Sequence, residues 1–434
     1  MKFAKVPEKP LDCWGFMVFN NARLMPEDQV KSFVRNFISI YQGHGGIVTQ
    51  KDPVIMYADL AKGVSQNLFE MFKKTGNKVN KKPQILCIIL PQKSSYPYND
   101  IKAYCDVNIG VPSQCLQSKH VQQNKPQYCS NVCMKFNAKL GGASVYLHGD
   151  DNPLYRKEPA LVIGADVSHS APGHATTSYA SMVGSTDLQG TRFCAIANTN
   201  GSRVEIINTK NMMRFVIQLL RIYKHTTTKT PQRIFYFRDG VSEGQYQEVL
   251  KSEVADIFEA CRTLQAGYEP KITVTICSKR HHFRFFPAEK SMADRNGNPF
   301  PGTIVERDIT HPDQYDFYLN SHNAIQGTSR PVHYHVIRDD NKMPVDVFQS
   351  FVYNNCYTYM RATNSVSLIP ATYYAHLASA RSRCHEPIIE PGFTVPSSTP
   401  RLPNEHGFID SRDPRPNHDL KSMHHQMQPT MWFI

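Results

Sequence analysis

The chain has 434 residues, with 49 Lys and Arg against 37 Asp and Glu and a formal net charge of +12. Its length predicts two or more domains, and no apolar run is long enough to predict a membrane-spanning helix. The 11 cysteines are irregularly spaced, which argues against a disulfide framework. Because the first residues also lack an apolar signal core, we expect a cytoplasmic protein with reduced thiols.

Positive charge is concentrated in the first third of the chain. Residues 1–140 carry 19 Lys and Arg against 9 Asp and Glu, whereas residues 141–434 carry 30 against 28. A basic surface can serve solubility alone, but this concentration favours capture of a polyanion, and nucleic acid is the expected one.

The first part alternates helical and strand-like segments. Residues 27–41 and 64–74 have the periodicity of amphipathic helices, and a basic loop is expected over residues 73–82. The run 84–90, which is apolar from Ile85 onward and is stopped by Pro91, predicts a buried strand. Helices alternating with continuous apolar strands predict a small parallel α/β domain.

The second part has a different order of elements. Three strands are expected first, at 160–166, 178–184 and 192–198. A helix at 211–224 and a strand at 233–239 follow. A second helix, opened by Ser242 with Gln245 in a capping box, then leads to a strand at 271–277. This is the order of a ribonuclease H-like domain. We place the boundary between residues 1–140 and 141–434, and we expect the proline-rich segment 387–416 to be a surface excursion.

Two of these predicted strands end in aspartate. Asp166 follows Leu-Val-Ile-Gly-Ala, and Asp239 follows Ile-Phe-Tyr-Phe-Arg. Each could simply begin a turn or cap a helix. Two carboxylates at neighbouring strand ends can also share a hard cation, which is how Mg²⁺ is held for phosphoryl chemistry.

Five motifs resemble the signatures of the PIWI domain of Argonaute proteins: Gly164–His169, Arg238–Gln245, Lys279–His282, Gln326–Pro331 and Tyr373–Leu377. With further matches to the MID domain, the chain resembles the MID and PIWI portions of a eukaryotic Argonaute, in particular its fungal, QDE-2-like members. We expect the N-terminal and PAZ domains that precede MID in that family to be absent here. The resemblance implies an α/β architecture, a Rossmann-like MID domain followed by a ribonuclease H-like PIWI domain.

The resemblance also implies a cleavage site. Asp166, Asp239 and His376 would be ligands for Mg²⁺ or Mn²⁺, and Glu205, in Val-Glu-Ile-Ile, would be the fourth catalytic residue. On their own, His376 could be a structural helix histidine and Glu205 a solvent-facing strand residue.

A guide-binding site is implied in the same way. The residues expected to hold the 5′ phosphate and first base of a guide RNA are Tyr98, Lys102, Gln114, Cys115, Lys135, Lys139 and Arg381. Lys135 and Lys139 are four residues apart and therefore share one helix face. An isolated pair of this kind would be read as two ordinary exposed lysines.

Four further histidines raise the question of zinc: His281, His282, His333 and His335. His333 and His335 lie on one face of a predicted strand. No cysteine or carboxylate stands at ligand spacing along the chain, so we expect RNA-backbone contacts or core hydrogen bonds instead.

Three functions compete. The first is a guide-directed, two-metal endoribonuclease whose partners are a small 5′-phosphorylated guide RNA and a complementary target RNA. The second is a cleavage-inactive guide-binding scaffold that recruits silencing effector proteins, and the third an unguided ribonuclease H-like nuclease. The Asp-Asp-His set favours the first, and the basic first part argues against the third. We expect a monomer with no membrane association.

Overall fold

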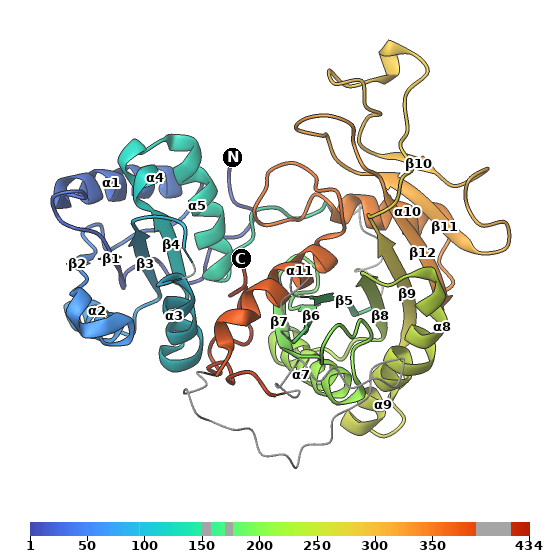
Figure 1. Cartoon of the computed structure of the whole chain (residues 1–434), viewed down its shortest axis with the longest axis horizontal. Coiled ribbons are helices and arrows are strands. Elements are labelled where there is room, and N and C mark those ends of the chain that lie inside the picture. Colours follow the sequence, from blue (N-terminus) through green and yellow to red (C-terminus); the bar gives the residue numbers. More distant parts are fainter. Residues whose placement is uncertain (95, 149–157, 170–176, 388–417) are drawn as a thin grey trace.

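Two separate β-sheets organise the chain, and each is covered by helices (Figure 1). The computed structural model describes residues 1–94, 96–148, 158–169, 177–387 and 418–434. The proline-rich segment 387–416 lies almost wholly outside the described residues. Among these residues no helix is both long and apolar enough to cross a membrane.

The first sheet has four parallel strands in the order β2-β1-β3-β4. Its elements are β1 (Trp14–Val18), α1 (Glu27–Gly43), β2 (Val54–Tyr57), α2 (Gly63–Val79), β3 (Ile85–Leu90), α3 (Tyr98–Ala103), β4 (Ser113–Gln117), α4 (Ser118–Gln123) and α5 (Pro126–Lys139). Every residue of the central strands β1 and β3 is buried. Helices α1, α4 and α5 pack on one face and α2 and α3 on the other, which confirms the predicted parallel α/β unit.

One local prediction in this part was wrong. The basic stretch from Lys73 is mostly helical, because α2 continues to Val79 and ends only where Asn80 takes a left-handed conformation. Lysine has good helix propensity, so a run of lysines does not itself end a helix.

The second sheet has eight strands in the order β10-β11-β12-β9-β8-β5-β6-β7. Its elements are β5 (Ala160–Ser168), β6 (Tyr179–Ser185), β7 (Phe193–Thr199), α7 (Thr209–Thr227), β8 (Arg233–Asp239), α8 (Tyr246–Val249), α9 (Ala255–Leu264), β9 (Lys271–Ser278), β10 (Thr303–Val305), β11 (Tyr315–Asn320), β12 (Val332–Asp339), α10 (Val345–Asn355) and α11 (Pro370–Ser382). Strands β5, β6 and β7 form an antiparallel meander, and β5, β8 and β9 run parallel. This is the ribonuclease H-like order predicted from the sequence. The predicted division after residue 140 falls between α5 and β5 and stays a prediction.

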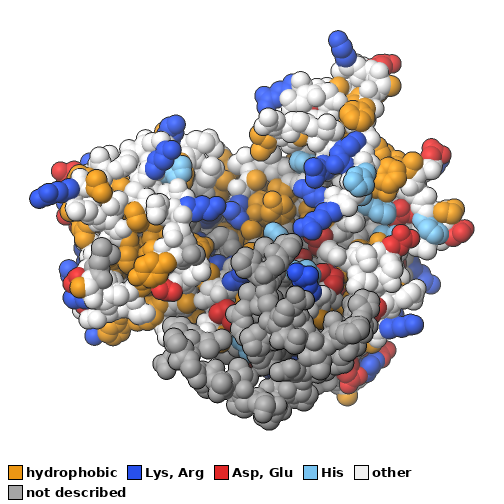
Figure 2. All heavy atoms as spheres, viewed as in Figure 1, with side chains coloured by type: hydrophobic (Ala, Val, Ile, Leu, Met, Phe, Trp, Pro, Cys, Tyr) orange, Lys and Arg blue, Asp and Glu red, His pale blue; other side chains and the backbone are white. Residues whose placement is uncertain are grey.

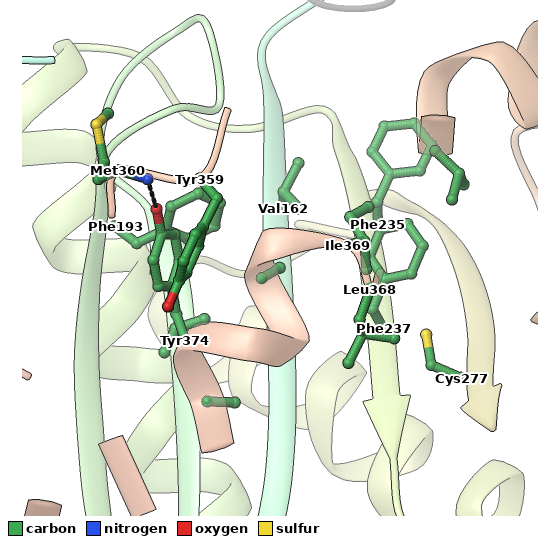
Figure 3. Packing of buried hydrophobic residues seen from close by; sticks show 14 of the residues in the cluster. Val162, Phe193, Phe235, Phe237, Cys277, Tyr359, Met360, Leu368, Ile369 and Tyr374 are labelled. Carbon is green, nitrogen blue, oxygen red and sulfur yellow. Dashed lines mark hydrogen bonds between the residues drawn. The ribbon is translucent and has the colours of Figure 1, made fainter. Parts of the chain in front are cut away.

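Helix α11 lies directly on the second sheet. Its buried Tyr374 packs among aromatic side chains and its hydroxyl accepts a hydrogen bond from the Met360 amide at 2.8 Å (Figure 3). A Cβ atom at Gly164 of β5 would lie 2.2 Å from the backbone of Ala371, so only glycine permits this approach. The close contact brings the exposed side of α11 over the end of β5.

The C-terminal residues join the two sheets. The His424 amide donates to the Asp106 carbonyl at 3.0 Å, beside α3, and the Trp432 indole donates to the Ala195 carbonyl of β7 at 3.2 Å. Met431 and Phe433 are buried with Trp432. The end of the chain is therefore part of the core and helps to hold the two units together.

Candidate functional sites at the sheet edge and at the domain junction

Asp166 and Asp239 lie side by side at one edge of the second sheet. Strands β5 and β8 are parallel with Ala165 opposite Arg238, so the next residue of each strand is an aspartate. Asp166 is buried, and burial together with the neighbouring Asp166 carboxylate raises the pKa of Asp239 to about 6. The Gly240 amide donates to Asp239 Oδ1 at 2.8 Å, and this hydrogen bond partly lowers the pKa of Asp239 again. Two poorly solvated carboxylates at this spacing form a site that favours a cation.

His376 approaches this pair from helix α11. Its Nδ1 lies 3.2 Å from Asp166 Oδ2, and the Ser379 hydroxyl donates to the same oxygen at 3.4 Å. The hydrogen bond with Asp166 raises the pKa of His376. The His376 side chain is 62% exposed, so it stands at the open side of the cluster rather than in the core.

Glu205 joins the same cluster from the loop before α7. Its Oε2 lies 2.8 Å from His169 Nε2, and its Oε1 lies 3.2 Å from Nη1 of Arg238. A Cβ atom placed on Gly240 would be 2.8 Å from Glu205 Oε1 and 3.8 Å from Asp166 Oδ1, so both carboxylates border that glycine. Glu205 is thus no solvent-facing strand residue, and the structure brings all four predicted cleavage residues together.

A buried ion pair supports the Glu205 loop. Arg238 and Glu253 are both fully buried, with Arg238 Nε 3.1 Å from Glu253 Oε2. The Tyr236 hydroxyl donates to Oε2 of Glu253 at 2.6 Å, and the Ile207 amide donates to Oε1 at 2.9 Å. Since buried charges persist only when fully paired, this network holds the loop that carries Glu205 in one position against β8.

The second site is a pocket of buried amines in the first unit. Lys102 and Lys139 are both buried, and their Nζ atoms donate to the same Ser113 carbonyl at 2.8 and 3.0 Å. Lys139 also donates to Gln114 Oε1 at 2.8 Å. Burial, followed by the charges of Lys102, Lys135 and Arg381, holds the pKa of Lys139 well below its usual value. Positive charges gathered against their own repulsion are the arrangement expected of an anion site.

Helix α11 completes this pocket from the second unit. Arg381 is buried, its Nη1 donates to the Tyr98 hydroxyl at 3.3 Å, and its Nη2 lies 2.7 Å from Asp106 Oδ2. Its Nε is buried and has no hydrogen-bond partner among the described residues. Cys115 borders the site through its backbone carbonyl, which accepts a hydrogen bond from the side-chain Nε2 of Gln114 at 2.9 Å. Figure 2 shows Lys and Arg side chains gathering on this face where the two units meet.

Comparisons with known proteins agree with this geometry. The model of the Piwi domain matches residues 85–386, and that of the Mid domain of argonaute matches residues 1–75. The chain belongs to the Argonaute family. It is 44% identical over 382 residues to the protein argonaute of Schizosaccharomyces pombe, covering 88% of this chain and 45% of that protein. The chain therefore spans less than half the length of this curated relative.

Solved structures give the same architecture. Kluyveromyces polysporus Argonaute with a guide RNA matches with a TM-score of 0.82 and 27% identity, over 100% of this chain and 49% of that one. The MID-PIWI domains of N. crassa QDE-2 AGO match over 100% of both chains with a TM-score of 0.64; their 19% identity makes this a likeness of fold. The Rossmann-like MID and ribonuclease H-like PIWI architecture expected from the sequence is confirmed.

Sequence reasoning missed one residue of the basic pocket in this Argonaute chain. Burial, and then the charge of Arg361, lowers the pKa of Lys135 to about 8, so Arg361 lies near enough to act on the charge of Lys135. Arg361 lies in the loop between α10 and α11. In the sequence Arg361 is simply a basic residue in a predicted PIWI loop. Its approach to helix α5 of the MID domain depends on how the two domains pack, which the sequence does not show.

His281 and His333 make hydrogen bonds, as expected, but the statement that no carboxylate lies near these histidines needs correction. A carboxylate does stand beside His333: Asp316 Oδ2, on the neighbouring strand β11, lies 2.6 Å from His333 Nε2. Distance along the chain concealed this partner, because 17 residues separate the two. His281 Nε2 instead lies 3.0 Å from the Pro331 carbonyl, and His282 is exposed.

Proposed function

We propose that this chain anchors the 5′ phosphate of a small guide RNA and cleaves a complementary RNA with the help of divalent metal ions. The observation that carries the proposal is the convergence of Asp166, Asp239, Glu205 and His376 at one edge of the PIWI sheet. A scaffold without cleavage has no need of such a cluster of repelling, poorly solvated carboxylates.

The donor set fits a hard divalent cation. Asp166, Asp239 and Glu205 offer carboxylate oxygens, which Mg²⁺ and Mn²⁺ prefer, and His376 adds an imidazole nitrogen. The raised pKa of Asp239 reflects its burial first and then repulsion from the Asp166 carboxylate. Bound there, such ions would lower the pKa of a water molecule and stabilise the negative charge of the leaving oxygen.

The protein's own contribution is orientation. Asp166 and Asp239 would hold the ions on rigid strand ends, and His376, exposed on α11, would complete the set from the substrate side. Arg238 and His169 each contact one oxygen of Glu205, so its carboxylate is preorganised toward the aspartates. Preorganised charge of this kind avoids a reorganisation penalty during the reaction.

The basic pocket would take the guide's 5′ end. Lys102, Lys135 and Lys139 supply positive charge, and Arg381 can offer parallel donors to phosphate oxygens. The Tyr98 ring, 5.6 Å from the Arg381 guanidinium, would stack on the first base. Because a guide phosphate would relieve the repulsion among these amines, its binding is expected to be strong and salt-dependent.

Cleavage and anchoring can be tested together. The purified chain is loaded with a 5′-phosphorylated guide and given a labelled matched RNA with Mg²⁺, Ca²⁺ or chelator. We expect one product with Mg²⁺ and none with chelator, and an Asp239→Asn variant that binds guide but does not cut. Tight guide binding without a product under any divalent ion would leave the chain as a scaffold that acts through recruited proteins.

A further inference from the structure

Three potential metal ligands, none of them part of the carboxylate cluster, share one face of the PIWI sheet. Strands β11 and β12 pair antiparallel, with Asp316 opposite His335. Directly opposed residues of an antiparallel pair project to the same face, and so do residues two apart on one strand. The backbone register therefore directs Asp316, His333 and His335 to one side.

Their ligand atoms converge. One carboxylate oxygen and one nitrogen from each imidazole all lie within 4.8 Å of one another. The other oxygen of Asp316, Oδ1, accepts a hydrogen bond from the His311 amide at 2.9 Å. That bond fixes the carboxylate so that Oδ2 faces the imidazoles, which is the way outer partners orient metal ligands.

One of the three residues carries an unsatisfied nitrogen. His335 is only 4% exposed, and its Nε2 is buried with no hydrogen-bond partner among the described residues. Buried polar groups are nearly always paired, so an orphaned imidazole nitrogen beside a carboxylate calls for a partner. Asp316 Oδ2 is already engaged with His333, and a cation between the three side chains would satisfy all of them.

Aromatic rings hold both imidazoles in place. Tyr318 of β11 stacks on His333 with ring centroids 4.3 Å apart, and Tyr246 of α8 meets the edge of His335 at 5.0 Å. The ligands therefore stand on two strands and are packed by a third element. Rigid support of this kind lets a site select metal geometry.

We propose that Asp316, His333 and His335 bind one Zn²⁺ ion, which ties β11 to β12. Two imidazoles and one carboxylate are a recognised zinc donor set with a fourth position left for water. Tetrahedral ligands about 2.0–2.1 Å from the ion lie roughly 3.3 Å from each other, which small side-chain adjustments can reach from the present spacing. His333, partly exposed, gives the ion a path from solvent.

The test uses the whole chain carrying Asp166→Ala, so that zinc at the carboxylate cluster does not obscure the result. This parent is stripped with chelator, equilibrated with Zn²⁺, freed of unbound metal and analysed for zinc per chain. His335→Phe removes the ligand nitrogen but keeps a ring against Tyr246. Asp316→Asn removes the charged ligand, and His225→Ala changes an exposed histidine on α7 as a matched control.

We expect about one zinc per chain in the parent and in His225→Ala, and none in the two ligand variants. Zinc should raise the melting temperature of the parent by about 2 °C or more and leave that of His335→Phe unchanged. In chelator, His335→Phe should melt no lower than the parent, because it buries no unpaired nitrogen. A parent without zinc, or ligand variants that retain it, would overturn the proposal.

Discussion

Guide binding should weaken at alkaline pH, mainly because Lys135 loses its proton. Burial and the charges of Arg361 and Lys102 lower the pKa of Lys135 to about 8 in the free protein. A phosphate beside the ammonium group favours its charged form, so the guide complex keeps the proton. Above pH 8, binding must therefore take up a proton that the free protein has lost.

The size of the effect follows from that pKa. Between pH 7 and pH 9 the protonated fraction of Lys135 falls from about 0.9 to about 0.1, and the dissociation constant of the guide should rise about tenfold. The 5′ phosphate contributes nothing in this window, since its second pKa is about 6. Lys139, whose pKa is also lowered, can add to the slope.

Lys135→Arg isolates the contribution of this residue. Arginine keeps its charge at both pH values. The affinity for a labelled 5′-phosphorylated guide is measured by fluorescence titration at pH 7 and pH 9. The rise in the dissociation constant between these pH values should be about tenfold smaller for Lys135→Arg than for the unmodified chain. A 5′-hydroxyl guide should show little change in either protein. If Lys135→Arg lost as much affinity as the unmodified chain, Lys135 would not meet the phosphate.

Three more outcomes follow from the contacts. Asp239→Asn should reduce single-turnover cleavage to background while changing guide affinity less than twofold, as measured by product formation and titration. Gly240→Ala should slow cleavage at least tenfold, because its Cβ would lie 2.8 Å from Glu205 Oε1 and the residue has a φ of +87°; rates equal to the unmodified chain would show that the Glu205 position is unimportant. Arg381→Ala should weaken a 5′-phosphorylated guide about tenfold, since charge-assisted hydrogen bonds contribute about 1.5–3 kcal/mol, with a 5′-hydroxyl guide as the control.

Local sequence patterns were sufficient to predict the fold, whereas the two sites also depend on tertiary contacts. The run from Arg233 to Asp239 was predicted as a strand with the limits that β8 has, because its apolar residues and the following glycine are local signals. Asp166 could be placed beside Asp239 because parallel neighbouring strands end at one edge. Arg361 and Asp316 could not be placed, because each reaches its partners across a domain junction or from another strand. The periodicity of a sequence does not show which side chains from distant segments come into contact.

The proposed cleavage residues show what a family resemblance can add to the evidence from residue patterns. Glu205 was chosen from a four-residue match alone, and nothing in its periodicity distinguished it from an exposed glutamate. Its contact with Arg238 is supported by the buried Glu253, which pairs with the same arginine and lies 48 residues further along the chain. No local rule predicts that a buried ion pair will support a distant loop.

The central claim is that the basic pocket anchors the guide's 5′ phosphate while the carboxylate cluster cuts the target RNA that is paired with that guide. Arg381 and His376 lie on the same helix, α11, so the distance from the basic pocket to the cluster is set by the protein. A series of 5′-phosphorylated guides, each shifted by one nucleotide along the same target, should move the cut by one nucleotide per guide on a sequencing gel. Cuts that stayed at one position on the target, or that spread over several positions for each guide, would contradict the account.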